Sequence, residues 1–591
     1  MIAAAALPYV PSLWGGFALD DYGLIVTDPL AQSLVHLPET FTKDFLRGTL
    51  GPNVIYYRPL VTASFQANYM IAGPNPFVFR LFNLLVHVAA ALLVFALARR
   101  LTRSLVAAGI AGVAFGVLPS HAEAAAWISG RTDLMSCVFT LGAVLVFAAS
   151  CEEERGFSWA SAAPANYPHP LQVGIPGGMT SWMGTRAGAC ALLTICALFS
   201  KENALVLPVL AAGCAWVFGC RASRADKLKW AAAFVVPLVV FMLIRRHAVH
   251  VTIVNYPTVA LGRRLLGVGI AYAAYLRMLL VPMVGRVVYD VFPIGMKYPA
   301  IALAAWLLPV GLVVLTVRLR RSSPVVAFGT MWVFLTLLPV SNILPTSGPL
   351  PAERFVYLAS VGSAIVLGWL ASRMLAWRPA SISVWPAVSV VIVVWYALLC
   401  GTLAYLTSQQ YESDVAWARA VSAINGRFFR SWAGFYFSEA GLFKDAAREY
   451  EAAIREATIT HVPPERADYV GLANARRALG QPEKAVEVLE AARATLAPSA
   501  RIELNLGTAC AQAGRMYDAE EAFTRAVRLD SKLAAAWRGL GRARLRLGGY
   551  RDAVTAYEHV FALGRASDRD RRELELALRA AGGTKKGGRE R

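Results

Sequence analysis

Long apolar runs that fill the chain up to about residue 410 constrain its fold more than any other feature. The chain has 591 residues and a mean hydropathy of +0.49, and only 16% of its residues are charged. Several runs approach the roughly 20 apolar residues that a helix needs to cross a bilayer. The runs lie at about 1–14, 81–98, 105–119, 134–150, 187–200, 203–219, 230–244, 264–283, 300–317, 325–344, 355–374 and 384–407. The sequence therefore predicts an all-α fold, with a polytopic membrane bundle of about eleven spans over residues 1–410.

Basic residues beside these runs predict how the chain is inserted. The formal net charge of +20 could indicate nucleic-acid binding, but the basic residues gather in short loops between apolar runs, as the positive-inside rule describes. Taking the clusters around Arg99, Arg221 and Arg318 as cytoplasmic, and the run at 264–283 as re-entrant, places the N-terminus inside and the C-terminus outside. We expect a bacterial inner-membrane protein with its polar loops and C-terminal region on the periplasmic side, and no nucleic-acid partner.

The polar region after the last run contains a repeat of 34 residues. This spacing separates Gly480 from Gly514 and Gly514 from Gly548. The same period relates Ala485, Ala519 and Ala553, and also Leu489, Phe523 and Tyr557, while an earlier copy contains Gly441, Ala446 and Tyr450. Glycine at a tight turn, alanine where two helices approach and a larger apolar residue beyond are typical of tetratricopeptide repeats. We expect a linker over 411–426, then an α-solenoid of about four repeats and a capping helix over 427–591.

Two adjacent carboxylates, Asp20 and Asp21, stand where the first apolar segment ends. A carboxylate at a membrane boundary is costly to desolvate unless water, a metal or a cation holds it, so it indicates a functional site. The same pair can also be two solvated residues that simply end a membrane segment. The pair taken alone leaves both interpretations open.

A second polar loop follows the run at 105–119 and contains His121 and Glu123. Side chains two residues apart do not share a helix face, but they converge if the segment is extended or turned. With Asp20 or Asp21 they would supply an acid–base pair, or ligands for a divalent cation such as Mg²⁺ or Mn²⁺ held by Asp20, Asp21 and Glu123. The alternative is an ordinary polar loop that caps a helix.

Basic residues at the same boundary are candidates for binding a phosphate. Arg58 follows two tyrosines, Lys201 and Glu202 separate two short apolar runs, and Arg354 precedes another run. Each arginine can bind a phosphate through two hydrogen bonds or extend to the membrane surface. Lys201 and Glu202 can contact an anionic head group or form a plain tight loop. Further candidate site residues are Arg131, Asp133 and Glu353.

These residues stand in short motifs that follow one another along the chain. The motifs are Phe17–Asp21, Tyr57–Leu60, Phe82–His87, His121–Glu123, Gly130–Asp133, Leu198–Glu202 and Ala352–Tyr357. In this order they resemble the transmembrane and tetratricopeptide-repeat O-mannosyltransferases of the C-type (GT-C) glycosyltransferase superfamily, along nearly the whole chain. The resemblance implies a polyprenyl-phosphate-linked sugar donor and an acceptor hydroxyl outside the cytoplasm. It also implies an essential acidic pair in the first outer loop, which Asp20 and Asp21 match.

The resulting hypothesis is an inverting glycosyltransferase that moves a sugar, mannose by the resemblance, to a protein Ser or Thr held by the repeats. Asp20 or Asp21 would be the general base, with His121 and Glu123 beside it. Arg58, Lys201 and Arg354 would stabilise the leaving lipid phosphate. The competing hypothesis is a non-catalytic, membrane-anchored scaffold whose repeats recruit partners. The two differ in whether the four candidate catalytic residues line a single cavity.

Overall fold

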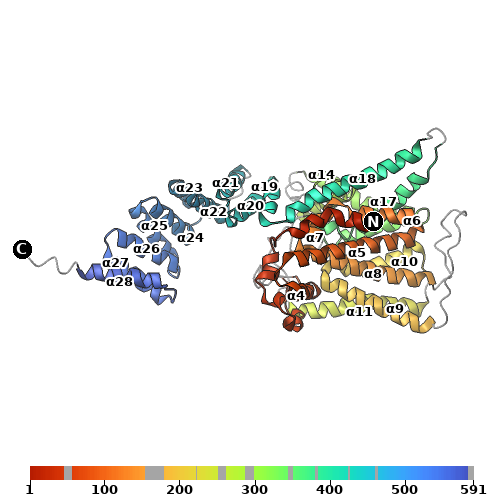
Figure 1. Cartoon of the computed structure of the whole chain (residues 1–591), viewed down its shortest axis with the longest axis horizontal. Coiled ribbons are helices and arrows are strands. Elements are labelled where there is room, and N and C mark those ends of the chain that lie inside the picture. Colours follow the sequence, from red (N-terminus) through yellow and green to blue (C-terminus); the bar gives the residue numbers. More distant parts are fainter. Residues whose placement is uncertain are drawn as a thin grey trace, which may run out of the picture. The chain divides into compact units, whose positions relative to one another are not determined.

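The computed structural model consists of helices, turns and loops, with no β-strand in the residues that it describes. It describes residues 1–45, 56–153, 179–220, 223–249, 261–285, 298–341, 343, 351–379, 384–423, 426–459 and 464–583. The chain divides into two compact units, Met1–Trp417 and Ala418–Arg591 (Figure 1). The all-α fold that the sequence predicts is confirmed.

The first unit is a helical bundle in which α5, α8, α9 and α11 lie side by side (Figure 1). Its longer helices are α4 (Pro59–Ala72), α5 (Pro76–Thr102), α6 (Leu105–Gly116), α8 (Arg131–Glu153), α9 (Met179–Ser200), α10 (Leu207–Phe218), α11 (Arg224–Ala248), α12 (Leu261–Leu280), α15 (Leu307–Leu319), α16 (Pro324–Leu337), α17 (Ser360–Ala376) and α18 (Trp385–Ser408). Side-chain caps start several of them, since Asn75, Ser104 and Ser223 each accept a backbone N–H in the first turn of the next helix. Such caps satisfy donors that the helix leaves unpaired.

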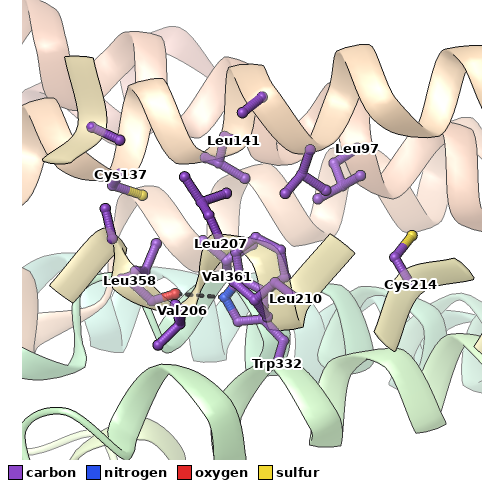
Figure 2. Close-up of a cluster of buried hydrophobic side chains, with 14 of the residues drawn as sticks. Leu97, Cys137, Leu141, Val206, Leu207, Leu210, Cys214, Trp332, Leu358 and Val361 are labelled. Atoms are coloured by element: carbon purple, nitrogen blue, oxygen red, sulfur yellow. Dashed lines mark hydrogen bonds between the residues drawn. The ribbon is translucent and has the colours of Figure 1, made fainter. Parts of the chain in front are cut away.

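Apolar side chains from α5, α8, α10, α16 and α17 form the core of this bundle (Figure 2). Leu141 of α8 and Leu210 of α10 are buried there, together with Trp332 of α16. The Trp332 indole Nε1 donates a hydrogen bond of 2.8 Å to the carbonyl of Leu358, so its one polar atom is satisfied inside the core. This packing places the ends of the helices, which carry the polar loops, at fixed positions.

Five helices of the described chain are long and apolar enough to cross a membrane. They are Pro76–Thr102, Ile128–Cys151, Arg224–Ala248, Pro299–Leu319 and Trp385–Tyr411. A sixth arises if Leu105–Gly116 and Pro119–Ala126, which meet at a bend of 55°, count as one span. The remaining predicted spans fall on shorter apolar helices, namely Ile2–Trp14, Thr185–Ser200, Glu202–Phe218, Pro324–Leu337 and Ser360–Ala376. The structure thus indicates a membrane protein, and the total of eleven crossings stays a prediction.

The run that the sequence predicts to be re-entrant forms one continuous helix, α12, which ends at Leu280 before Pro282. The backbone therefore does not turn back within α12 itself. Gly285 donates its N–H to Thr407 Oγ1 at 3.0 Å. The re-entrant assignment of this run stays a prediction.

The second unit consists of paired antiparallel helices. They are α20 (Arg427–Glu439), α21 (Phe443–Ile459), α22 (Arg466–Ala478), α23 (Pro482–Thr495), α24 (Ala500–Gln512), α25 (Met516–Leu529), α26 (Ala534–Arg546), α27 (Tyr550–Ala562) and the final helix α28 (Asp568–Gly583). The glycines at the predicted turns all have positive φ, with Gly514 at +79°. The alanines that share the repeat, among them Ala519, are completely buried, and Phe523 is 4% exposed. The tetratricopeptide pattern is confirmed residue by residue.

Candidate functional site

Three ion pairs lie where the polar loops of the first unit meet. Lys201 Nζ contacts both carboxylate oxygens of Asp133 at 2.6 Å. Arg58 contacts Glu202 Oε2 at 3.3 Å through Nε and Nη2. The Arg354 guanidinium pairs with Glu123, and the Arg354 backbone N–H donates to Glu123 Oε2 at 2.8 Å. We refer to these six residues, together with Asp20, as the charged cluster.

Breaks between helices position the members of the charged cluster. Lys201 stands between α9 and the 3₁₀ helix η8 (Glu202–Val206), and Asp133 lies in the first turn of α8. Glu123 lies in the first turn of the short helix α7 (Ala122–Ala126), and Arg354 lies in the 3₁₀ helix η9 (Glu353–Val356). A carboxylate in the first turn of a helix is favoured by the helix dipole. The sequence motifs therefore mark helix ends that converge in space.

The three ion pairs are close enough to influence one another. Burial opposes the charged form of Arg354, but Glu123, Asp133 and Asp20 outweigh it and raise the pKa of this guanidinium. Burial lowers the pKa of Lys201 to about 8, with Asp133 opposing this change and Arg58 and Arg354 adding to it. Removing one member of a buried pair would leave a charge uncompensated, at a cost of roughly 3–5 kcal/mol. The charged cluster is thus one electrostatic unit.

Asp20 joins the charged cluster, whereas Asp21 does not. Burial raises the pKa of the Asp20 carboxyl, and Arg354 and Arg58 partly offset the effect. Within the described chain, no hydrogen-bond donor is found for the Asp20 carboxylate, and the residue is half-buried. A half-buried carboxylate with a raised pKa, held near two arginines, can accept a proton from a bound group.

Asp21 is fully buried, and neighbouring residues hold its carboxylate by hydrogen bonds. Its Oδ1 accepts hydrogen bonds from Ser129 N at 3.0 Å and Ser129 Oγ at 2.5 Å, and its Oδ2 accepts one from Ala18 N at 3.1 Å. Burial raises the pKa of Asp21 to about 7, although these hydrogen bonds and the nearby Arg80 act in the opposite direction. The adjacent aspartates therefore face different surroundings, and Asp21 anchors its loop to the segment that precedes α8.

His121 lies among aromatic rings. It is completely buried, its ring centroid lies 4.4 Å from that of Tyr357 and 4.6 Å from that of Phe115, and its Nε2 is 2.8 Å from Ser360 Oγ. The segment is helical here, with η5 (Pro119–His121) leading directly into α7. Residues two apart on a helix point in different directions. The convergence of His121 with Glu123, which an extended segment would permit, does not occur.

The remaining candidates have separate contacts. Arg131 is buried and bridges α4 and α5, donating to Asn83 Oδ1 and Phe79 O at 2.8 Å and to Ser64 Oγ at 3.1 Å. These contacts hold helices together. Glu353 is buried next to Gly285, where an added Cβ would overlap the Glu353 carboxylate. Neither residue is part of the charged cluster.

The predicted cation site does not form. No three His, Cys, Asp or Glu side chains of the described residues lie together as metal ligands. Asp21 is engaged by Ser129 and Ala18, and Glu123 by Arg354, so these carboxylates and Asp20 do not converge. The residues present do not fit a three-carboxylate metal site.

Several residues that hold the site were absent from the sequence prediction. Arg80 is 1% exposed and donates to three backbone carbonyls, those of Ala126, Gly16 and Tyr411, at 2.5, 2.5 and 2.9 Å. Asp414 accepts the Leu19 N–H at 2.7 Å. A charge near the start of an apolar run was the available signal for Arg80. Asp414 lies 395 residues from its partner, and nothing local indicates the contact.

No protein-family model matches the chain. A protein O-mannosyl-transferase of Caenorhabditis elegans is 23% identical over 473 residues, which are 77% of this chain and 62% of that protein. The chain is similar to protein O-mannosyl-transferases over this stretch. Proteins of the same name from Drosophila melanogaster and Homo sapiens are 35% and 32% identical over 147 and 157 residues. These stretches are 24% and 26% of this chain and 17% and 18% of the two proteins.

The resemblance to protein O-mannosyl-transferases that the motifs indicate is thus confirmed by named relatives. The chain spans less than two thirds of the length of each of these three relatives. All three protein O-mannosyl-transferases are animal proteins, so a bacterial inner membrane stays a prediction. Among solved structures, a thermophilic TPR protein of Thermus thermophilus is 22% identical over 32% of this chain and 94% of that chain, with a TM-score of 0.22.

Proposed function

We propose that this protein is a membrane glycosyltransferase that transfers mannose from a polyprenyl-phosphate-linked donor to a protein Ser or Thr hydroxyl, on the extracytoplasmic face. The names of the relatives support the sugar and the class of acceptor. The observation that carries the proposal is the gathering of Lys201 and Arg354 over the ring of Phe355, at 5.0 and 5.2 Å, with Asp20 nearby, a half-buried carboxylate with no hydrogen-bond donor found within the described chain. A carboxylate and several cations in one place are what this transfer needs.

Asp20 is the general base in this proposal. A neutral hydroxyl is a poor nucleophile, so a carboxylate accepts its proton while the oxygen attacks the sugar C1. The bond between C1 and the phosphate oxygen breaks on the opposite side, which inverts the configuration at C1. A raised pKa makes Asp20 a better proton acceptor than an ordinary aspartate at the same pH.

Arg354 and Arg58 hold the donor phosphate in this proposal. The side chain of Arg354 is 33% exposed and that of Arg58 is 12% exposed, whereas Lys201 is 7% exposed. The two arginines therefore have more surface available for a phosphate, and the more deeply buried Lys201 contributes its charge. A cation placed beside the leaving oxygen stabilises the charge that develops there as the bond breaks.

The repeats hold the acceptor protein in this proposal, and a purified-protein assay tests the function as a whole. The wild-type protein in detergent is given a panel of polyprenyl-phosphate sugars and a Ser/Thr-rich peptide, and the transferred sugar is detected by mass spectrometry. We expect transfer from the mannose donor, with inverted configuration at C1. A protein that binds the peptide and transfers no sugar from any donor would instead be the scaffold of the competing hypothesis.

A further inference from the structure

Leu19, the residue immediately before Asp20, has a backbone conformation that leucine rarely adopts. Leu19 has a φ of +57°, in the left-handed region. A bulky L-residue is rare there, because its Cβ approaches the following carbonyl oxygen at a cost of roughly 1–2 kcal/mol. Such a conformation persists only where surrounding contacts impose it, and conformations of this kind concentrate at functional sites.

The contacts that impose it come from the segment directly after α18. Asp414 Oδ1 accepts the Leu19 N–H at 2.7 Å, and the Glu412 carbonyl accepts the Gly16 N–H at 2.9 Å. Asp414 begins α19 (Asp414–Ser422) and lies within the first unit. The loop that bears the aspartate pair is thus tied at two backbone positions to a segment almost 400 residues later in the chain.

Two buried side chains from elsewhere in the bundle also contact the loop that bears the aspartate pair. Arg80 of α5 donates to both Gly16 O and Tyr411 O, so a single guanidinium bridges the loop and the segment after α18. Trp127 Nε1 donates to Ala18 O at 3.1 Å, and its ring stacks on Tyr411. The backbone before Leu19 is therefore fixed, Ser129 holds the Asp21 side chain after it, and the Leu19 N–H donates to Asp414.

We propose that Asp414 is a positioning residue that holds Leu19 in the left-handed conformation and thereby directs the Asp20 carboxylate toward the charged cluster. The inference rests on the proposed function of Asp20. Asp414 does not touch the donor phosphate or the acceptor in this scheme. Its loss changes the fraction of molecules in which Asp20 is oriented for proton transfer, and leaves the affinity for the donor unchanged.

The test compares Asp414→Ala and Asp414→Asn in the full chain. The alanine variant removes the acceptor, and we expect kcat to fall by about 10-fold or more, the usual value of a hydrogen bond to a charged group. The KM for the donor should stay constant. The asparagine variant keeps an oxygen for the Leu19 N–H and should retain most of the activity. Asp226→Ala, which removes a partly exposed carboxylate that pairs with Lys229 in the first turn of α11, is the matched control.

A second substitution tests whether backbone conformation is the cause. Glycine occupies the left-handed region without strain, so Leu19→Gly in the Asp414→Ala background should restore kcat by about five-fold, as expected from relief of roughly 1 kcal/mol. Arg103→Gly is the control, because Arg103 also has a positive φ, of +53°, but lies at the end of α5. Arg103→Gly in the same background should not restore kcat.

Amide hydrogen exchange over residues 16–21 supplies a readout that does not need activity. We expect protection in the wild type and in Asp414→Asn, and faster exchange in Asp414→Ala. If the wild type transfers no sugar, the proposed function fails, and the exchange data still decide whether Asp414 holds the loop. Unchanged exchange and kcat in Asp414→Ala would overturn the inference. So would equal loss in the asparagine variant, or equal rescue by Leu19→Gly and Arg103→Gly.

Discussion

At the scale of single residues, the structure separates two neighbouring aspartates that the sequence could not distinguish. Arg354 and Arg58 act electrostatically on Asp20, while Asp21 is enclosed by hydrogen bonds from Ser129 and Ala18. Adjacent side chains in a turn point in different directions, and only the folded backbone shows which one meets the cations. The location of the acidic pair was predictable from its place at the end of an apolar segment. Which of the two aspartates has which role was not predictable from the sequence.

Asp21 should make stability depend on pH in a specific direction. Burial raises its pKa from 3.8 to about 7 in the folded state, so the folded protein favours the protonated form. The stability this provides is fully present below about pH 4 and is lost as the pH rises through 7. The melting temperature of the wild type should therefore fall relative to that of Asp21→Asn between pH 4 and pH 7. Parallel melting curves for the two proteins across this range would contradict the assignment.

Arg354→Ala should weaken binding of a short-chain polyprenyl phosphate by about 10-fold or more, because it removes a charge-assisted hydrogen bond. It also leaves the buried Glu123 without its partner and should lower the melting temperature. The double variant Glu123→Gln/Arg354→Ala separates the two effects. It should recover the melting temperature and not the affinity, as measured by calorimetric titration. Recovery of both would show that Arg354 acts only through folding.

At the scale of helices, the repeats were predictable and the polar loops were not. The 34-residue period identified Gly514 and Ala519 correctly, because each position meets a local demand: a positive φ at the turn and a close helix contact. His121 was expected to converge with Glu123 in an extended segment, and this does not occur because the segment is helical. Arg80 and Asp414 were missed because their partners are distant in sequence, so that no local pattern reports them.

Gly514→Ala should destabilise the repeats through backbone strain alone. A Cβ at Gly514 would meet no atom within 4 Å, so the φ of +79° is the sole source of the cost. We expect a loss of roughly 1 kcal/mol, seen as about five-fold faster amide exchange across α24 and α25. Gly582→Ala, at an equally open position without a positive φ, is the control and should not accelerate exchange. Equal effects of both substitutions would show that strain at the turn is not the cause.

At the scale of the whole molecule, the predicted topology places the basic loops at one end of the bundle and the charged cluster at the other. The structure brings Asp20, Glu123, Lys201 and Arg354 to one place, as a common side of the membrane requires. The basic residues at 221–229 and 318–321 assign the other side to the cytoplasm by the positive-inside rule. The interactions among these residues indicate that they share one side of the membrane. Whether that side is the outer or the cytoplasmic one rests on this charge pattern.

Reporter fusions in the full chain test the absolute orientation. Alkaline phosphatase, which is active only outside the cytoplasm, should be active when fused after residue 591. Green fluorescent protein, which fluoresces only inside, should fluoresce when inserted between residues 160 and 170, because the positive-inside rule places that loop in the cytoplasm. The opposite pattern for both reporters would invert the bundle and place the charged cluster in the cytoplasm.

The most direct test of the central claim is sugar transfer by Asp20→Asn. The amide keeps the size of the side chain and cannot accept the hydroxyl proton, so the rate should fall by roughly 10²–10⁴-fold while affinity for the polyprenyl phosphate stays within about two-fold. The melting temperature should not fall below that of the wild type, since burial disfavours the charged carboxylate and no hydrogen bond of the described chain ends on it. Transfer by Asp20→Asn at the wild-type rate would contradict the assignment of Asp20 as the base.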